Sequence, residues 1–158
     1  MPSATPSNQT GQAPTAAAGV LVILGASGDL TKRLLMPAIY NLACEGLLPD
    51  EFAVVGMALT DLTTAEFRAG QRQEIARFAT RKTFDEDRWQ WLESRLHYTP
   101  GNFADPVAYD RLMKLVLEVG QETGAAGNTL IYLAISPDFF AEVNQHLDQV
   151  KQVGEELG

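Results

Sequence analysis

Cysteine, basic residues and long hydrophobic runs are all scarce in this sequence. Cys44 is the single cysteine, so the chain cannot form an internal disulfide, which suits a reducing compartment. No stretch approaches the ~20 continuous apolar residues that a membrane-spanning helix needs. With 12 basic against 20 acidic residues, the net charge of −8 argues against a nucleic-acid backbone as partner. We therefore expect a cytoplasmic protein with no membrane or nucleic-acid partner.

Targeting signals are also absent from the first residues. Residues 1–18 have neither a basic segment nor an apolar core, so they do not read as a secretory signal. Their proline, serine, threonine, glutamine and alanine content predicts a disordered tail. Residues 19–158 then form one domain, since 46% of the chain is apolar and its length suits a single core.

Apolar runs of strand length alternate with amphipathic stretches through the rest of the chain. Strands are expected at residues 20–24, 52–59, near 97–103 and at 129–135, and helices after Asp29, Thr63, Phe84, Asp105 and Ser136. On the first helix Leu30, Leu34, Leu35, Ile39 and Leu42 recur at helical spacing, and Cys44 falls on the apolar side as a buried structural thiol. This alternation predicts an α/β fold, a Rossmann-like doubly wound parallel sheet that ends after its fourth strand and helix.

The stretch "VLVILGASGDLTKRLLMPAIYNL", residues 20–42, is the most informative part of the sequence. Gly25 and Gly28 follow a buried strand and precede a helix, at the edge where open α/β sheets bind ligands. Backbone amides and the helix dipole can hold a phosphate there, and glycine lets a pyrophosphate approach closely and permits a positive φ. The alternative is a tight strand-to-helix turn without a ligand. The P-loop pattern G-x-x-x-x-G-K-[ST] does not occur.

Asp29, directly after the two glycines, bears on the hypothesis that this turn holds a phosphate. A carboxylate in the first turn of a helix is ordinary capping, which would require no ligand. Beside a bound pyrophosphate it would repel the ligand unless it turned toward a ribose hydroxyl. The residue therefore has two open interpretations, helix cap or ribose contact.

"GASGDLTKRLLMPAIYNL" closely resembles the first strand, turn and helix of glucose-6-phosphate dehydrogenases, whose fingerprint is G-A-S-G-D-L-[AT]-K-[RK]-x-L-x-P-[AT]-[IL]. The resemblance continues through "GLLPDEFAVVGMALTDLT", "HYTPGNFADPVAYDRL" and "NTLIYLAISPDFFAEV", and so covers residues 20–148. It implies an NAD- or NADP-binding domain of an oxidoreductase of glucose metabolism and the pentose phosphate pathway. That enzyme oxidises glucose 6-phosphate to 6-phosphogluconolactone.

The resemblance also implies roles for individual residues. The turn would wrap the diphosphate and the nicotinamide half of the cofactor, and Lys32 would lie nearby, as a contact or as a solvated lysine. The residues of the turn are Gly25, Ala26, Ser27, Gly28, Asp29 and Leu30. Tyr132, Ala134 and Pro137 would border the adenine-to-nicotinamide cleft, although plain packing is the default explanation for the last two.

The end of the second strand departs from the family pattern. The family has G-x-A-R-[ST], whose arginine clamps the 2′-phosphate of NADP, whereas this chain has "GMALTDLT". Leu59 replaces the arginine, Thr60 follows, and Asp61 would repel a phosphate. An acidic residue beyond this strand can hold the ribose diol of NAD, or Asp61 can simply cap a loop. We expect NAD to be favoured over NADP.

The family's catalytic motifs are missing. E-K-P-F-G, D-H-Y-L-G-K-E and the histidine base lie beyond the family region that this sequence covers. His97 and His146 sit in neither motif and are expected to be structural, and no metal site is expected. The chain alone is predicted to be inactive, and sugar phosphate to bind only the full-length enzyme, which the resemblance implies to be a homo-oligomer.

Two other functions compete with this interpretation. A stand-alone, non-catalytic nucleotide-binding or interaction protein derived from the family would have the same sequence features. A short-chain reductase also favours G-A-S-G, but it needs a Tyr-x-x-x-Lys pair for its proton relay. Here Met113 follows Tyr109 at that spacing, and Ser136 follows Tyr132.

Overall fold

The computed structural model describes residues 18–79, 83–125 and 128–157, with side chains as far as residue 149. The predicted tail therefore lies outside the described residues, except for its last residue. The strands are β1 (Gly19–Leu24), β2 (Phe52–Ala58), β3 (Leu96–Pro100) and β4 (Thr129–Leu133). The α-helices are α1 (Met36–Cys44), α2 (Thr64–Phe78), α3 (Glu86–Glu93), α4 (Pro106–Thr123) and α5 (Phe140–Leu157). None of the described helices is long and apolar enough to cross a membrane.

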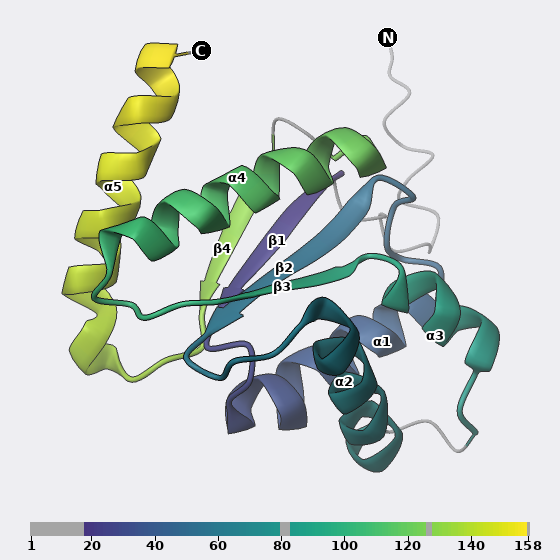
Figure 1. The fold of residues 1–158 in the computed structure, drawn as a ribbon. Helices are drawn as coiled ribbons and strands as arrows, with labels where there is room; N and C mark the ends of the chain where they lie inside the picture. Colours follow the sequence, from purple (N-terminus) through teal and green to yellow (C-terminus); the bar gives the residue numbers. More distant parts are fainter. Residues whose placement is uncertain (1–17, 80–82, 126–127, 158) are drawn as a thin grey trace, which may run out of the picture.

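The four strands form one parallel sheet in the order β3-β2-β1-β4. Helices α1, α2 and α3 lie on one face of the sheet, and α4 and α5 lie on the other (Figure 1). In the register, Leu24 at the end of β1 pairs with Met57 of β2 and Leu133 of β4. The carboxyl ends of β1, β2 and β4 therefore meet at one edge. This arrangement confirms the predicted α/β, Rossmann-like architecture.

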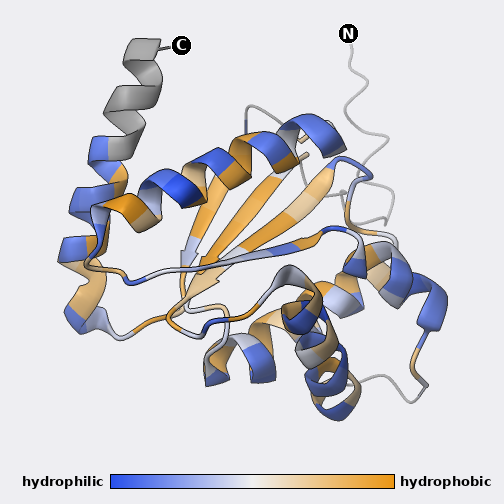
Figure 2. Ribbon diagram, in the orientation of Figure 1, coloured by the Kyte–Doolittle hydropathy of each residue, from blue (hydrophilic) through white to orange (hydrophobic). Residues whose placement is uncertain are grey.

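The core forms two layers because successive side chains of a strand point to opposite faces. On β1, Ile23 joins the cluster under α1–α3, while Val22 and Leu24 join the cluster under α4. All seven residues of β2 are buried, as expected for a strand covered on both faces. Strands β1 and β2 and most of β4 accordingly appear as an apolar layer between helices with mixed surfaces, whereas β3 is mostly hydrophilic (Figure 2).

Helix boundaries follow the predicted capping residues. Thr63 caps α2 in a reciprocal capping box, since its side chain accepts from the Glu66 amide and the Glu66 carboxylate accepts from the Thr63 amide. Asp105 caps α4 by accepting from the Val107 amide. A cap of this kind contributes roughly 0.5–2 kcal/mol. The predicted starts of both helices are confirmed.

The first helix differs from its prediction. The helical segment begins at Asp29, but its residues Thr31–Leu35 form a π-helical turn before α1. A π turn contains more residues than an α turn, so it shifts the phase of the apolar positions. Leu30, Leu34 and Leu42 are consequently exposed, at 40%, 64% and 39%, and the expected buried face is wrong at these three positions.

Two further expectations need correction. Cys44 is free and packs against the cluster under α1–α3, but it is only partly buried rather than fully buried. The fourth strand ends at Leu133, two residues earlier than expected, because the chain turns at Ala134 toward the short 3-10 turn Pro137–Phe139.

Candidate functional site

Gly25 closes β1 in a conformation that other residues rarely adopt. Its φ is +97°, and a Cβ placed there would lie 2.2 Å from the Ala134 carbonyl oxygen. The Gly25 amide donates to the Met57 carbonyl at 2.8 Å, and the Ala134 amide donates to the Leu24 carbonyl at 2.8 Å. The turn is thus fixed between the ends of β2 and β4, where only glycine fits.

Ala26 is the point at which the turn packs against β2. Its side chain is fully buried, and a Cβ added to Gly56 would lie 2.5 Å from the Ala26 Cβ. Gly56 therefore makes room for the turn. Sequence reasoning missed this residue, although a glycine inside an apolar strand is a signal for close approach of another backbone.

Gly28 has a different role from Gly25. Its φ is not positive, and a Cβ there would meet only the Gly25 carbonyl oxygen, at 3.3 Å. The positive φ that the sequence analysis attributed to glycines of this turn therefore belongs to Gly25 alone. The space in front of Gly28 is open, on the side where the helical segment begins.

Thr31 stabilises the turn through a side-chain hydrogen bond to its backbone. It is completely buried, and its Oγ1 donates to the Gly25 carbonyl at 3.0 Å, while the Lys32 amide donates to the Gly28 carbonyl at 3.1 Å. Thr31 was not among the predicted site residues. Its occurrence where a third glycine often stands was the available signal. Asp29 and Leu30 are exposed beside this turn.

A hydrogen-bond chain joins the turn to the end of β2. The Ser27 and Thr60 hydroxyl oxygens lie 2.9 Å apart. The Tyr98 hydroxyl donates to the Thr60 carbonyl at 2.6 Å and lies 3.1 Å from the Ala58 carbonyl. Burial raises the pKa of Tyr98, and a hydrogen bond with Ser27 partly opposes this. The phenol is therefore a neutral donor at physiological pH and fixes the backbone beyond β2.

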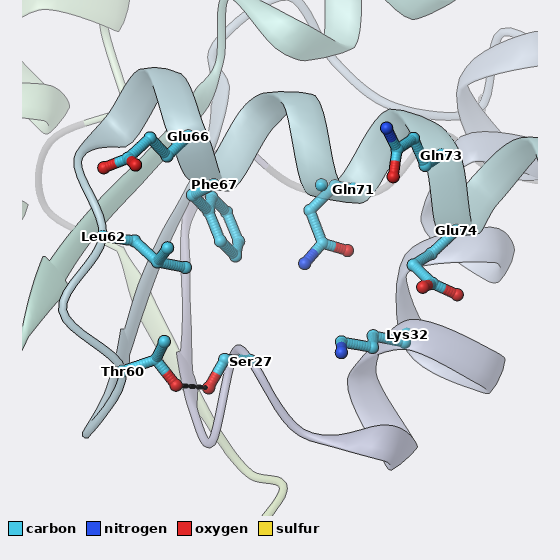
Figure 3. A pocket seen from close by; sticks show the side chains of 10 residues that line it. Ser27, Lys32, Thr60, Leu62, Glu66, Phe67, Gln71, Gln73 and Glu74 are labelled. Carbon is cyan, nitrogen blue, oxygen red and sulfur yellow. Dashed lines mark hydrogen bonds between the residues drawn. The ribbon is translucent and has the colours of Figure 1, made fainter.

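Beside this hydrogen-bond chain, between the turn and α2, is a groove of about 350 Å³, which we call the α2 groove (Figure 3). It is lined by Ser27, Lys32, Thr60, Leu62, Glu66, Phe67, Gly70, Gln71, Gln73 and Glu74. Three predicted residues, Ser27, Lys32 and Thr60, thus come together in one place. Leu59 and Asp61 are exposed at the end of β2 and do not line the groove.

The predicted residues after β4 stand at the same edge of the sheet. Ala134 contacts the turn through its backbone and packs against the cluster under α1–α3. Tyr132, on β4, is 40% exposed, and Pro137 is exposed at the start of the 3-10 turn. No hydrogen bond between the turn and either of these two side chains is seen in the described part of the chain.

Neither histidine belongs to this site. His97 lies on β3, where burial and the nearby Arg68 lower its pKa. His146 stacks on Tyr109 at 4.9 Å, joining α5 to α4. Burial raises the pKa of Tyr109 to about 12. The residues described contain no group of three or more histidine, cysteine, aspartate or glutamate side chains that could hold a metal ion.

Comparisons with known proteins agree with this geometry. Residues 22–157 match the family described as glucose-6-phosphate dehydrogenase, NAD binding domain. Glucose-6-phosphate 1-dehydrogenase of Chlamydia muridarum is 40% identical over 82% of this chain and 26% of that relative. Glucose-6-phosphate 1-dehydrogenase 2 of Mycobacterium tuberculosis is 35% identical over 80% of this chain and 24% of that relative.

Among solved structures, a glucose-6-phosphate dehydrogenase in complex with its substrate glucose 6-phosphate superposes with a TM-score of 0.74 and 26% identity, over 87% of this chain and 28% of that chain. The chain spans about a quarter of the length of the curated relatives it matches. The family match, over residues 22–157, includes the glycine turn, the second half of β1 and strands β2, β3 and β4. This chain belongs to the glucose-6-phosphate dehydrogenase family and spans its NAD-binding domain.

Proposed function

We propose that this chain is the cofactor-binding part of a glucose-6-phosphate dehydrogenase and binds a nicotinamide dinucleotide at the carboxyl ends of β1, β2 and β4. The observation that supports this most directly is the open space in front of Gly28, which a Cβ would enter without meeting other side chains. A pyrophosphate fits this space because the first amides of a helix have no intrahelical partner and attract anions.

The predicted site residues form two groups, one around the pyrophosphate and one toward the nicotinamide of the cofactor. Gly25 and Ala26 shape the turn, while the segment from Ser27 to Leu30 surrounds the pyrophosphate, and Lys32 adds a positive charge nearby. Tyr132, Ala134 and Pro137 border the cleft toward the nicotinamide. Asp29 lies exposed at the start of the helical segment, where it can reach a ribose hydroxyl.

In the longer enzyme, the cofactor would accept a hydride from C1 of glucose 6-phosphate, giving 6-phosphogluconolactone. The base that takes the hydroxyl proton and the groups that bind the sugar phosphate would come from outside this chain. Neither His97, on β3, nor His146, on α5, lines the α2 groove, which supports that division. The full-length protein would be a cytoplasmic homo-oligomer.

The cofactor preference follows from the end of β2. Leu59, 67% exposed, offers no charged hydrogen bond to a 2′-phosphate, and an arginine fork at this place would contribute roughly 1.5–3 kcal/mol. Asp61 adds negative charge two residues later. Thr60 can donate one neutral hydrogen bond. We therefore expect NAD to bind better than NADP.

Titration of both cofactors into the wild type and Leu59→Arg tests this function. The wild type should bind NAD more tightly than NADP, reduce neither with glucose 6-phosphate, and gain NADP affinity by about tenfold or more in Leu59→Arg. Glu118→Arg, at an exposed position of α4, controls for added positive charge. NADP binding tenfold tighter than NAD in the wild type, or turnover of the sugar phosphate, would contradict the proposal.

A further inference from the structure

Gln71 is a polar side chain that the fold buries without satisfying it. It lies in the middle of α2, is 3% exposed, and lines the α2 groove. Its Nε2 makes one long hydrogen bond, 3.5 Å, to the Ala26 carbonyl, while its Oε1 has no hydrogen-bond partner among the described residues. In Figure 3 its amide points from α2 into the space between Phe67 and Lys32.

A buried acceptor without a partner costs free energy, so its retention calls for a reason. Core packing alone would be served better by leucine or methionine at this position. The Nε2 bond ties α2 to the phosphate-binding turn, but it leaves Oε1 unexplained. A group that enters the groove and donates a hydrogen bond would complete this amide.

The other lining groups also favour a donor over an anion. Glu66 and Glu74 bring two carboxylates to the groove, and Lys32 brings one ammonium group. Ser27 and Thr60 are hydrogen-bonded to each other at one end of the groove, so both hydroxyl oxygens can accept a further bond, while one of the two hydroxyls keeps its proton to donate. Among the lining residues, the carboxylate and hydroxyl groups that can accept a hydrogen bond therefore outnumber the positively charged groups that would attract an anion.

The groove lies where a dinucleotide bound at the turn would place its adenosine ribose. In dinucleotide-binding sheets the ribose hydroxyls reach the end of the second strand, which here is the segment with Thr60. Thr60 is linked to Ser27 of the turn on one side and faces the groove on the other. A ribose that reached Thr60 in this way would present its 2′ substituent to the groove.

We infer that the α2 groove receives the 2′ face of the adenosine ribose, and that Gln71 determines its preference for a hydroxyl over a phosphate. This inference rests on the proposed function. A 2′-hydroxyl can donate to Oε1 of Gln71, whereas a phosphate, largely dianionic at pH 7, only accepts. The phosphate would also meet the Glu66 and Glu74 carboxylates. Gln71 thus selects NAD independently of Leu59 and Asp61.

The test compares NAD with 2′-deoxy-NAD, which differs only in the hydroxyl concerned, by calorimetry on the whole chain. The wild type should bind NAD about fivefold to tenfold more tightly than the deoxy analogue. Gln71→Met, which keeps the length of the side chain without its polar atoms, should bind both alike. Gln90→Met, the same change at an exposed position of α3, should keep the wild-type ratio.

The pattern of outcomes separates the inference from the proposed function. Equal binding of the two ligands by the wild type overturns the inference and leaves dinucleotide binding intact. A Gln71→Met protein that weakens both ligands equally and keeps their ratio also overturns it, because that is the effect of a purely structural role. Binding of neither dinucleotide by the folded wild type overturns the proposed function together with the inference.

A second variant tests the ligand preference of the α2 groove without changing the buried residue Gln71. Glu74→Gln removes one carboxylate from the groove without enlarging the side chain. NADP affinity should rise about threefold at low salt, with NAD unchanged and the gain reduced by added salt. Glu118→Gln, on the opposite face of the sheet, should change neither affinity. An unchanged NADP affinity in Glu74→Gln would contradict the acceptor-rich groove.

Discussion

Strands β2 and β4 flank β1 on its two sides, and both read as apolar strands, yet they have opposite environments. Every residue of β2 is buried, whereas none of the five residues of β4 is. Among the described strands, β2 pairs with two neighbours and β4 with one. Composition makes a segment a strand, but its position in the sheet decides how much of it is buried.

The same contrast divides the site. On the β2 side, Ser27, Thr60 and Tyr98 form a continuous hydrogen-bond chain, and Gly56 brings the turn into contact with the strand. On the β4 side, the turn is hydrogen-bonded through the backbone of β1 to Ala134 and lies beside the Ile135 side chain, and Tyr132 is exposed. The half that would hold the phosphates and the adenosine is therefore organised in advance, and the nicotinamide half is open.

Gly25 is the residue at which the two sides meet, so its substitution should have the largest effect. In Gly25→Ala the new Cβ would lie 2.2 Å from the Ala134 carbonyl oxygen at a φ of +97°. The backbone directly after β4 would have to move, and the free energy of unfolding should fall by about 3 kcal/mol or more. Urea denaturation followed by circular dichroism measures this loss.

Gly46→Ala is the matched control for Gly25→Ala. Gly46 has a φ of +71°, but nothing lies within 4 Å of an added Cβ. It should lose only the cost of the left-handed conformation, about 1 kcal/mol. Equal losses in the two variants would show that the contact with Ala134 is unimportant and that the turn is not held between the strands.

The sequence predicted the glycine turn, the four strands and the helix caps, because each depends on local chemistry. It failed where distant parts of the chain meet. The contact of Gly56 with Ala26 and the hydrogen bond from Gln71 to the Ala26 carbonyl join segments 30 and 45 residues apart, and no local pattern reports them. Exposure of Leu34 follows from a π turn that the regular spacing of leucines concealed.

Gly28→Val should separate ligand binding from folding on the organised side of the site. The conformation of Gly28 is open to other residues, and a Cβ meets only the Gly25 carbonyl oxygen, at 3.3 Å. The free energy of unfolding should change by about 1 kcal/mol or less. Dinucleotide binding should be lost, because the side chain fills the space proposed for the pyrophosphate. Intact binding in the folded variant, measured by calorimetry, would contradict the phosphate-binding turn.

The smallest expected effect lies on β4 and tests the comparison of the two strands directly. Val54 on β2 and Leu130 on β4 are the two register partners of Leu21, so all three side chains point to the face that carries α1–α3. Val54 is fully buried there, whereas Leu130 is 69% exposed.

Val54→Thr places an unpaired hydroxyl in the core and should cost about 1–3 kcal/mol. Leu130→Thr introduces a β-branched residue, which suits an exposed strand position, and should change the free energy of unfolding by about 0.5 kcal/mol or less. Parallel urea titrations of the two variants measure the difference. A loss at Leu130 as large as that at Val54 would mean that β4 is covered in solution, and the contrast between the two strands would then disappear.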